Sequence, residues 1–112
     1  MSSKISIDEL AAALTQPYVH LELGQVNDHA VYLVRFKGDY EFHRHTRDEM
    51  YMVLEGEATL LFSHEPPLVL KKNECAVVRS YTTHSPSSEE GALVLMFKPK
   101  EMFASSSEPE AE

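Results

Sequence analysis

Residues 38–56, GDYEFHRHTRDEMYMVLEG, contain two histidines and a glutamate at a spacing typical of a metal site. His43 and His45 are two positions apart, so in an extended strand both imidazoles point to the same face. A short polar run that predicts a turn leads to Glu49, and a segment rich in β-formers follows. We therefore expect a strand, a turn and a second strand, with two imidazoles and one carboxylate facing inward. Such a set on one side of a divalent ion is the facial triad, which leaves the opposite coordination positions open.

A fourth candidate ligand, His84, lies far downstream in a loop-like run that follows the strand-like residues 75–78. It completes the site only if the sheet curls back on itself, as barrels and jelly rolls do. The alternative is that His43, His45 and Glu49 are polar residues on the solvent face of an antiparallel pair. The carboxylate spacing, the turn and His84 together favour metal binding.

The expected cofactor is one divalent transition metal ion. Imidazole suits Fe, Ni, Cu and Zn, and a hard carboxylate also admits Mn. Because the candidate set contains no thiolate and leaves coordination positions open, Fe(II), Mn(II), Ni(II) and Zn(II) all remain candidates.

The pattern H-x-H-x3-E-x6-G, formed by His43, His45, Glu49 and Gly56, resembles the first motif of the cupin superfamily. Residues 73–88 resemble the second, looser motif, which ends in a metal-binding histidine, here His84. The resemblance covers roughly residues 19–99. It implies a double-stranded β-helix, an antiparallel jelly-roll barrel, with one metal ion held by three histidines and one glutamate.

The chain departs from the cupin motifs at several positions. Gly38 stands one residue closer to the histidine pair than the opening glycine of the first motif usually does. In the second motif, non-consensus residues replace a glycine, a proline, a second glycine and the closing asparagine; they are Asn73, Arg79, Tyr81 and Ser88. The replacements leave the metal ligands in place, but they weaken the transfer of any particular substrate.

The rest of the chain predicts an all-β domain behind a short helix. Ser6 can cap a helix, and Pro17 is expected to end it, so residues 1–17 form a helical segment that covers an edge strand. Residues 18–100 are the expected barrel, with about eight or nine short strands between turns. We expect a break in the strand pattern at residues 55–57, a polar connection at residues 86–91 and a disordered acidic tail at 104–112.

Several other residues are candidates for the wall of a pocket. Tyr51 shares a strand face with Glu49, and Tyr32 and Phe36 face the same interior if their strand neighbours the hairpin. Ordinary core packing is the alternative for all three. Arg79 precedes the loop that carries His84, so it either binds a carboxylate or phosphate bidentately or is a solvated surface residue. His20 and His29 are expected at the surface or in turns, away from the metal.

Composition excludes some partners. The net charge of −8 argues against nucleic acid, which needs a cationic face. No apolar run approaches the ~20 residues that span a bilayer, and the N-terminus lacks the apolar core of a signal peptide, so we expect a cytoplasmic protein without a membrane partner. The one cysteine, Cys75, allows no internal disulfide and is expected to be buried.

For function, the residues and the resemblance predict a metal-dependent enzyme, of the dioxygenase or isomerase type, that acts on a small polar metabolite. A phosphosugar isomerase would need cations at the pocket, and Arg35 and Arg79 are the main candidates. One alternative is a non-catalytic module that binds or senses a metal or small molecule, and another is a metal-free structural cupin. The resemblance also implies a homodimer, with the N-terminal segment contributing.

Overall fold

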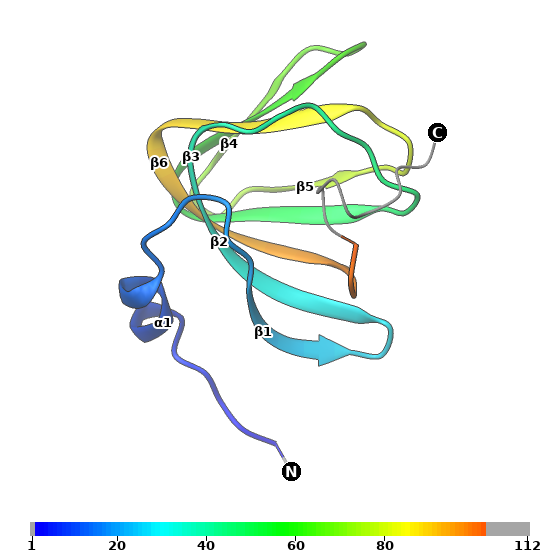
Figure 1. The fold of residues 1–112 in the computed structure, drawn as a ribbon. Helices are drawn as coiled ribbons and strands as arrows, with labels where there is room; N and C mark the ends of the chain where they lie inside the picture. The colour runs from blue at the N-terminus through cyan, green and yellow to red at the C-terminus, as the bar shows by residue number, and fades with distance from the viewer. Residues whose placement is uncertain (1, 103–112) are drawn as a thin grey trace.

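The computed structural model describes residues 2–102, so the expected acidic tail at 104–112 lies outside the described residues. One short helix and six strands form the domain (Figure 1), and almost all of the regular structure is antiparallel sheet. In chain order the elements are α1 (Ile7–Ala13), β1 (Leu21–Val26), β2 (His29–Asp39), β3 (Glu49–Phe62), β4 (Leu68–Lys71), β5 (Cys75–Val78) and β6 (His84–Pro99). The expected all-β barrel with an N-terminal helix is confirmed.

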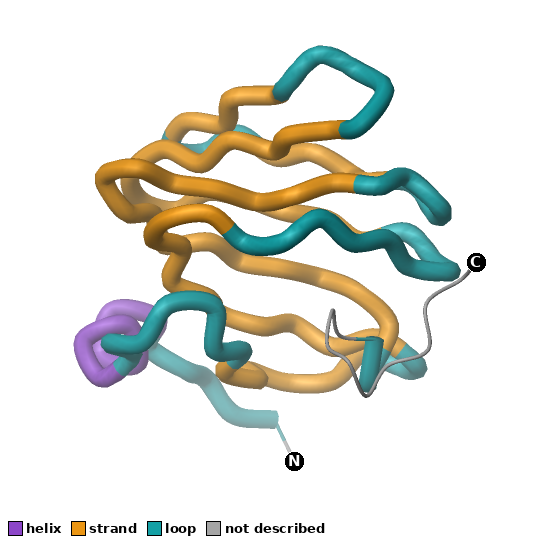
Figure 2. The backbone as a smooth tube through the Cα atoms, turned by 45° about the horizontal axis from the view of Figure 1, so that its top comes forward, coloured by secondary structure: helices purple, strands orange, loops and turns teal. Residues whose placement is uncertain are grey.

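The two long strands, β3 and β6, belong to both layers of the barrel. The first half of β3 pairs with β5 and with the second half of β6. The second half of β3 pairs with β4 and with the first half of β6, and β2 pairs with the other edge of β6. In Figure 1 the layers join at the left, where β6 turns, and Figure 2 shows the same wrapping in the backbone trace.

The expectation of about eight or nine short strands is wrong, because two predicted breaks lie inside continuous strands. Residues 86–91 belong to β6 instead of forming a connection, and Gly56 lies within β3. The pairing of β3 with β6 is irregular around Gly56, which is the signature of a β-bulge. Gly56 has a φ of 80°, and a Cβ at this position would overlap the carbonyl oxygen of Gly91. Both strands therefore bend without ending.

Helix α1 packs across the outer face of the sheet. Ser6 caps it as expected and accepts a hydrogen bond from the Glu9 amide, but the helix ends at Ala13, before Pro17. The Arg35 guanidinium on β2 donates to the carbonyl oxygens of Ala11 and Leu14 at 2.9 and 2.8 Å, so two carbonyls at the end of the helix have a partner. The helix shares an apolar cluster with Leu33 and Leu93 on the central strands β2 and β6, and Leu21 and Leu23 of the edge strand β1 pack against the same cluster.

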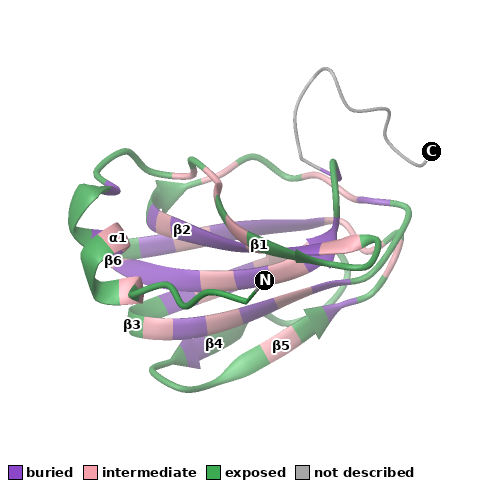
Figure 3. Ribbon diagram, turned by 90° about the horizontal axis from the view of Figure 1, so that it is seen from below, coloured by how far each residue is buried: buried purple, intermediate pink, exposed green. Residues whose placement is uncertain are grey.

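Inside the barrel, buried side chains from β2, β3 and β6 form most of the main core. The ribbon segments that carry buried residues are purple in Figure 3. Tyr32, Val34 and Phe36 alternate along one face of β2, as the sequence predicts. The expectation for Cys75 is wrong: it is exposed, and its neighbour Ala76 packs against the core instead. Between residues 2 and 102 there is no helix with the length and apolar character to cross a bilayer.

Candidate metal centre

Four side chains from three separate segments meet inside the barrel. The potential ligand atoms of His43, His45 and Glu49 all lie within 4.8 Å of one another. Glu49 and His84 are the first residues of β3 and β6. The two histidines of the H-x-H pair lie outside the regular strands, so the first strand of the expected hairpin does not form. His43 makes an isolated bridge with His84 through two backbone hydrogen bonds of 2.9 Å.

The loops that carry the histidines are tied to each other. The Asp48 carboxylate accepts hydrogen bonds from the Ser80 amide at 2.8 Å and from the Arg79 guanidinium at 3.1 Å. The Tyr81 amide donates to the His45 carbonyl at 2.8 Å. These bonds fix the segment before β3 against the segment before β6, so the imidazoles are held by the loops as well as by the barrel.

Backbone carbonyls set the tautomers of two candidate ligands. Nδ1 of His43 lies 2.9 Å from the Glu41 carbonyl oxygen, and Nδ1 of His84 lies 2.7 Å from that of Thr82. A carbonyl only accepts, so in both rings Nδ1 carries the hydrogen and Nε2 is the atom left to bind a metal. Metal-binding histidines commonly donate their second N–H in this way.

The carboxylate of Glu49 is buried and ionised. Its Oε1 accepts a hydrogen bond from the Tyr51 hydroxyl at 2.7 Å and lies 2.8 Å from His84 Nε2. Burial raises the pKa of Glu49, but the hydrogen bond with His84 and the charge of Lys98 lower it by more, to about 2. Burial also raises the pKa of Tyr51 well above its usual range, so its hydroxyl stays a donor.

The residues fit a divalent transition metal ion on two grounds. First, Oε2 of Glu49 is buried and has no hydrogen-bond partner within residues 2–102. The Nζ of Lys98 lies 3.9 Å from this oxygen, which is the distance of an ion pair. Second, Nε2 of His84 and Oε1 of Glu49 lie 2.8 Å apart, so a single ion can bind both atoms. Imidazole nitrogens with one carboxylate form a donor set that such metals accept.

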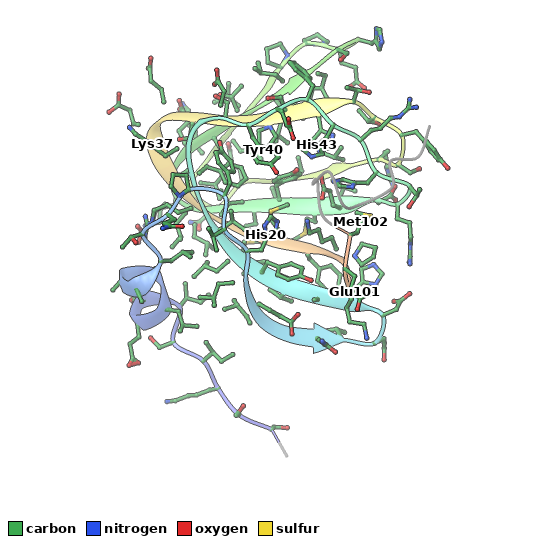
Figure 4. All side chains as sticks on the ribbon, in the orientation of Figure 1. His20, Lys37, Tyr40, His43, Glu101 and Met102 are labelled. Carbon is green, nitrogen blue, oxygen red and sulfur yellow. The ribbon has the colours of Figure 1, made fainter. Side chains whose placement is uncertain are left out.

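A cavity of about 20 Å³, which has room for about one water molecule, opens onto this cluster. Figure 4 shows His20, Tyr40 and His43 between the two layers, whereas Lys37 lies at the edge of the molecule. The wall is mostly aromatic and apolar, with polar side chains at the cluster; the lining residues are Tyr18, His20, Val34, Phe36, Tyr40, His43, His45, Glu49, Tyr51, Pro86, Met96 and Lys98.

The four pocket residues expected from the sequence lie in three different places. Phe36 and Tyr51 line the cavity. Tyr32 is buried behind the wall and does not line the cavity. Arg79 is not a pocket residue: its side chain is 77% exposed and pairs with Asp48 on the surface, because the loop before β6 turns it outward. The surface alternative for Arg79 therefore holds.

The cation that faces the cavity is Lys98, which sequence reasoning missed. Its side chain is 2% exposed, and its Nζ lies 3.2 Å from Nε2 of His20 and 3.9 Å from Oε2 of Glu49. Period-2 alternation along β6 was the available signal, because Val94, Met96 and Lys98 share one face. Arg35, the other candidate cation, is instead bound to the carbonyls of α1.

His20 also lines the cavity, so its expected surface position is wrong. The segment before β1 runs beside β2, where the Tyr18 amide donates to the Arg35 carbonyl at 2.8 Å, and this places the imidazole inward. Burial first, and then the charge of Lys98, lowers the pKa of His20 to about 3, so the ring is neutral. His29 lies at the start of β2 beside Asp28 and lines a different, surface hollow.

The fold and site define a small all-β barrel with a candidate metal centre inside it. A family model described as "Cupin domain" matches residues 32–98, and the chain belongs to this family. It is 33% identical to the uncharacterized protein YdbB of Bacillus subtilis over 85 residues, which cover 75% of each chain.

Two solved structures show how widely this fold is shared. A cupin-2 domain protein from Shewanella frigidimarina superposes with a TM-score of 0.82, at 23% identity, over 86% of this chain and 94% of that chain. Hydroquinone 1,2-dioxygenase PnpCD, solved in complex with Cd²⁺ and 4-hydroxybenzonitrile, superposes with a TM-score of 0.70, at 17% identity, over 81% of this chain and 69% of that chain. At these identities the likeness establishes the fold.

Proposed function

We propose that the protein binds one divalent transition metal ion through His43, His45, Glu49 and His84 and acts as a metal-dependent enzyme on a small metabolite. The observation that carries the proposal is the convergence of three ligand atoms within 4.8 Å at a buried cluster that a cavity reaches from solvent. Fe, Mn, Ni and Zn are all compatible with the donor set.

The residues around the cluster have distinct roles in this proposal. The ion, when bound, supplies a Lewis acid or the place where substrate and dioxygen meet. Tyr51 orients the Glu49 carboxylate, and the Thr82 carbonyl orients the His84 ring. The aromatic wall, with Phe36 and Tyr51, excludes bulk water from the ligand.

Between the two reaction types, dioxygenase chemistry is favoured over phosphosugar isomerisation. Phosphate recognition uses several cationic or amide donors, and Lys98 is the one Lys or Arg side chain among the described residues that line the cavity. The same fold also occurs in a hydroquinone dioxygenase that is solved with a metal ion and an aromatic ligand. The first point argues against a phosphorylated substrate, and the second supports an oxygen-dependent reaction.

Elemental analysis of freshly purified protein without a chelating tag tests the metal site. We expect about one equivalent of a transition metal in the wild type, a large loss in His45→Ala, and no loss in His64→Ala, which changes an exposed loop histidine. Circular dichroism of each variant checks the fold. Stoichiometric metal in His45→Ala, or no metal in the wild type after incubation with Fe, Mn, Ni and Zn salts, contradicts the proposal.

The second candidate function is a non-catalytic binding or sensing module, which the same cluster and cavity support. Oxygen consumption by the metal-loaded protein, measured across a panel of small aromatic and aliphatic metabolites, separates the two. Uptake that depends on one metabolite and disappears in His45→Ala supports the oxygenase. Ligand binding without uptake or any product supports the module.

We further propose that the protein works as a cytoplasmic homodimer. Within residues 2–102, β4 pairs only with β3, and this edge strand exposes Leu68 and Val69 at 46% and 50%. An exposed apolar edge favours pairing with another chain. Light scattering at several concentrations, with Val69→Lys as the comparison, tests the dimer; a monomeric wild type contradicts it.

A further inference from the structure

The cavity above the candidate ligands is too small for the metabolite that the proposed function requires. Its volume of about 20 Å³ has room for about one water molecule. Pockets that hold small-molecule ligands measure about 300–1,000 Å³. Part of the wall therefore has to move when a metabolite enters.

Four of the lining residues are partly exposed and form the solvent side of the cavity: Tyr18, His20, Tyr40 and His43. The last two belong to the segment after β2, which is fixed to β6. His43 bridges His84 through two backbone hydrogen bonds of 2.9 Å, and the Tyr40 amide donates to the Pro86 carbonyl oxygen at 2.9 Å. Movement on this side would break pairing beside the candidate ligands.

Tyr18 and His20 belong to residues 15–20, which run from the end of α1 to the start of β1 (Figure 1) and are called the strap below. The other four residues of the strap are exposed. The Tyr18 amide joins the strap to β2 by donating to the Arg35 carbonyl oxygen at 2.8 Å. Because the strap lies outside the strands, its outward movement would leave the pairing of the sheet intact.

The Tyr18 side chain closes the mouth of the cavity. The centre of its ring lies 5.0 Å from that of Phe36 on β2 and 4.9 Å from that of Tyr40. Its hydroxyl donates to the Gly38 carbonyl oxygen at 2.7 Å. Burial first, and then the charge of Asp39, raises the pKa of Tyr18 to about 12, so the hydroxyl stays a donor. These contacts hold the ring in place.

The backbone of Tyr18 opposes the closed position. Its φ of 62° lies in the left-handed region, where a residue with a Cβ is strained. Such strain persists only where the surrounding structure holds it, and it is common at ligand clamps and switch regions. Side-chain contacts therefore favour closure while the backbone favours release, and the strap is poised to open.

We propose that Tyr18 is the gate of this cavity: a metabolite reaches the metal centre only when the strap moves outward and takes the Tyr18 ring out of the mouth. The proposal rests on the proposed function for the metal and the metabolite. Return of the ring would then enclose the bound ligand and shield it from bulk water, as the lids of many enzymes do.

Thiol labelling of the protein in EDTA measures the opening of the strap. Val34→Cys places a probe at a buried position that lines the cavity, in a Cys75→Ser background because Cys75 is exposed. The rate of reaction with methyl methanethiosulfonate is compared among this protein and its Tyr18→Phe, Tyr18→Ala and Val19→Ala variants. Val19 is the control, because it lies on the same strap but is 45% exposed. Circular dichroism checks the fold of each protein, and urea unfolding gives its free energy of unfolding.

Tyr18→Phe removes the hydrogen bond to Gly38 and should speed labelling about 2–10-fold. Tyr18→Ala also removes the ring and should speed labelling about tenfold or more, whereas Val19→Ala should change the rate by less than about twofold. Equal rates in all four proteins would overturn the inference, as would an acceleration no greater than the loss of free energy of unfolding predicts. Because the labelling needs no metal, a wild type that binds none would overturn the proposed function without changing this result.

Discussion

Replacing Gly56 by alanine tests whether the bend of β3 depends on a close approach of two backbones. Gly56 has a φ of 80°, and an added Cβ would overlap the carbonyl oxygen of Gly91, which cannot rotate away as a side chain can. Gly38 has a similar φ of 76°, but a Cβ there meets nothing within 4 Å. A Cβ on Gly24 also meets nothing within 4 Å, and its φ is not in the left-handed region. Alanine at these positions therefore separates backbone strain from steric overlap.

The expected magnitudes differ among the three alanine variants. A residue with a Cβ in the left-handed region costs about 1–2 kcal/mol, which is the expected loss for Gly38→Ala. Overpacking adds about 1–3 kcal/mol, so Gly56→Ala should lose about 2–5 kcal/mol. Gly24→Ala should be neutral or gain up to about 1 kcal/mol, because it only restricts the unfolded chain.

Urea unfolding followed by circular dichroism measures the three free energies of unfolding. The buffer should contain EDTA, because a bound metal would stabilise the folded state and mask the differences. We expect the order Gly24→Ala, Gly38→Ala, Gly56→Ala, from most to least stable. If Gly56→Ala is no less stable than Gly38→Ala, the backbone contact at the bend does not constrain the fold as argued.

Three further predictions concern the site and the helix. Tyr51→Phe removes the donor to Glu49 and should weaken metal binding about 10–100-fold in a chelator competition, without unfolding the protein. The pKa of His20 is about 3 in the folded state and ordinarily about 6.5, so the unfolded chain binds the extra proton and stability should fall as the pH falls from about 6.5 toward 3. His20→Gln should flatten this loss in urea titrations between pH 6.5 and 5; an unchanged slope would contradict the assignment. Ser6→Ala should cost about 1 kcal/mol through loss of the helix cap, whereas Ser3→Ala, outside α1, should cost nothing measurable.

Local spacing was sufficient to predict the candidate ligands. His43, His45 and Glu49 lie within seven positions, so a turn before β3 brings them together whatever the rest of the chain does. His84 required the further expectation that the sheet curls back on itself, and the start of β6 does lie beside His43, with which His84 forms a bridge. The pattern of side-chain types therefore carried most of the information about the cluster.

Residues placed by tertiary packing were beyond the reach of sequence reasoning. His20 faces inward because the segment before β1 lies along β2, a contact that no local pattern encodes. Arg79 and Arg35 looked like pocket cations, but hydrogen-bonding groups elsewhere, Asp48 and the end of α1, hold them outside. The predicted strand lengths were wrong for a related reason: the sequence does not distinguish a glycine inside a β-bulge from a glycine in a turn.

The position of β6 in the sheet has a consequence for how the chain folds during synthesis. β6 is the last strand of the described chain, yet it lies between β2 and β3 and pairs with both. Until it leaves the ribosome, the β1–β2 hairpin and the β3–β4–β5 segment have no strand in common, and each exposes an unpaired edge. A nascent chain halted before His84 would therefore hold two half-sheets with unpaired edges, and it would depend on chaperones until the central strand is supplied.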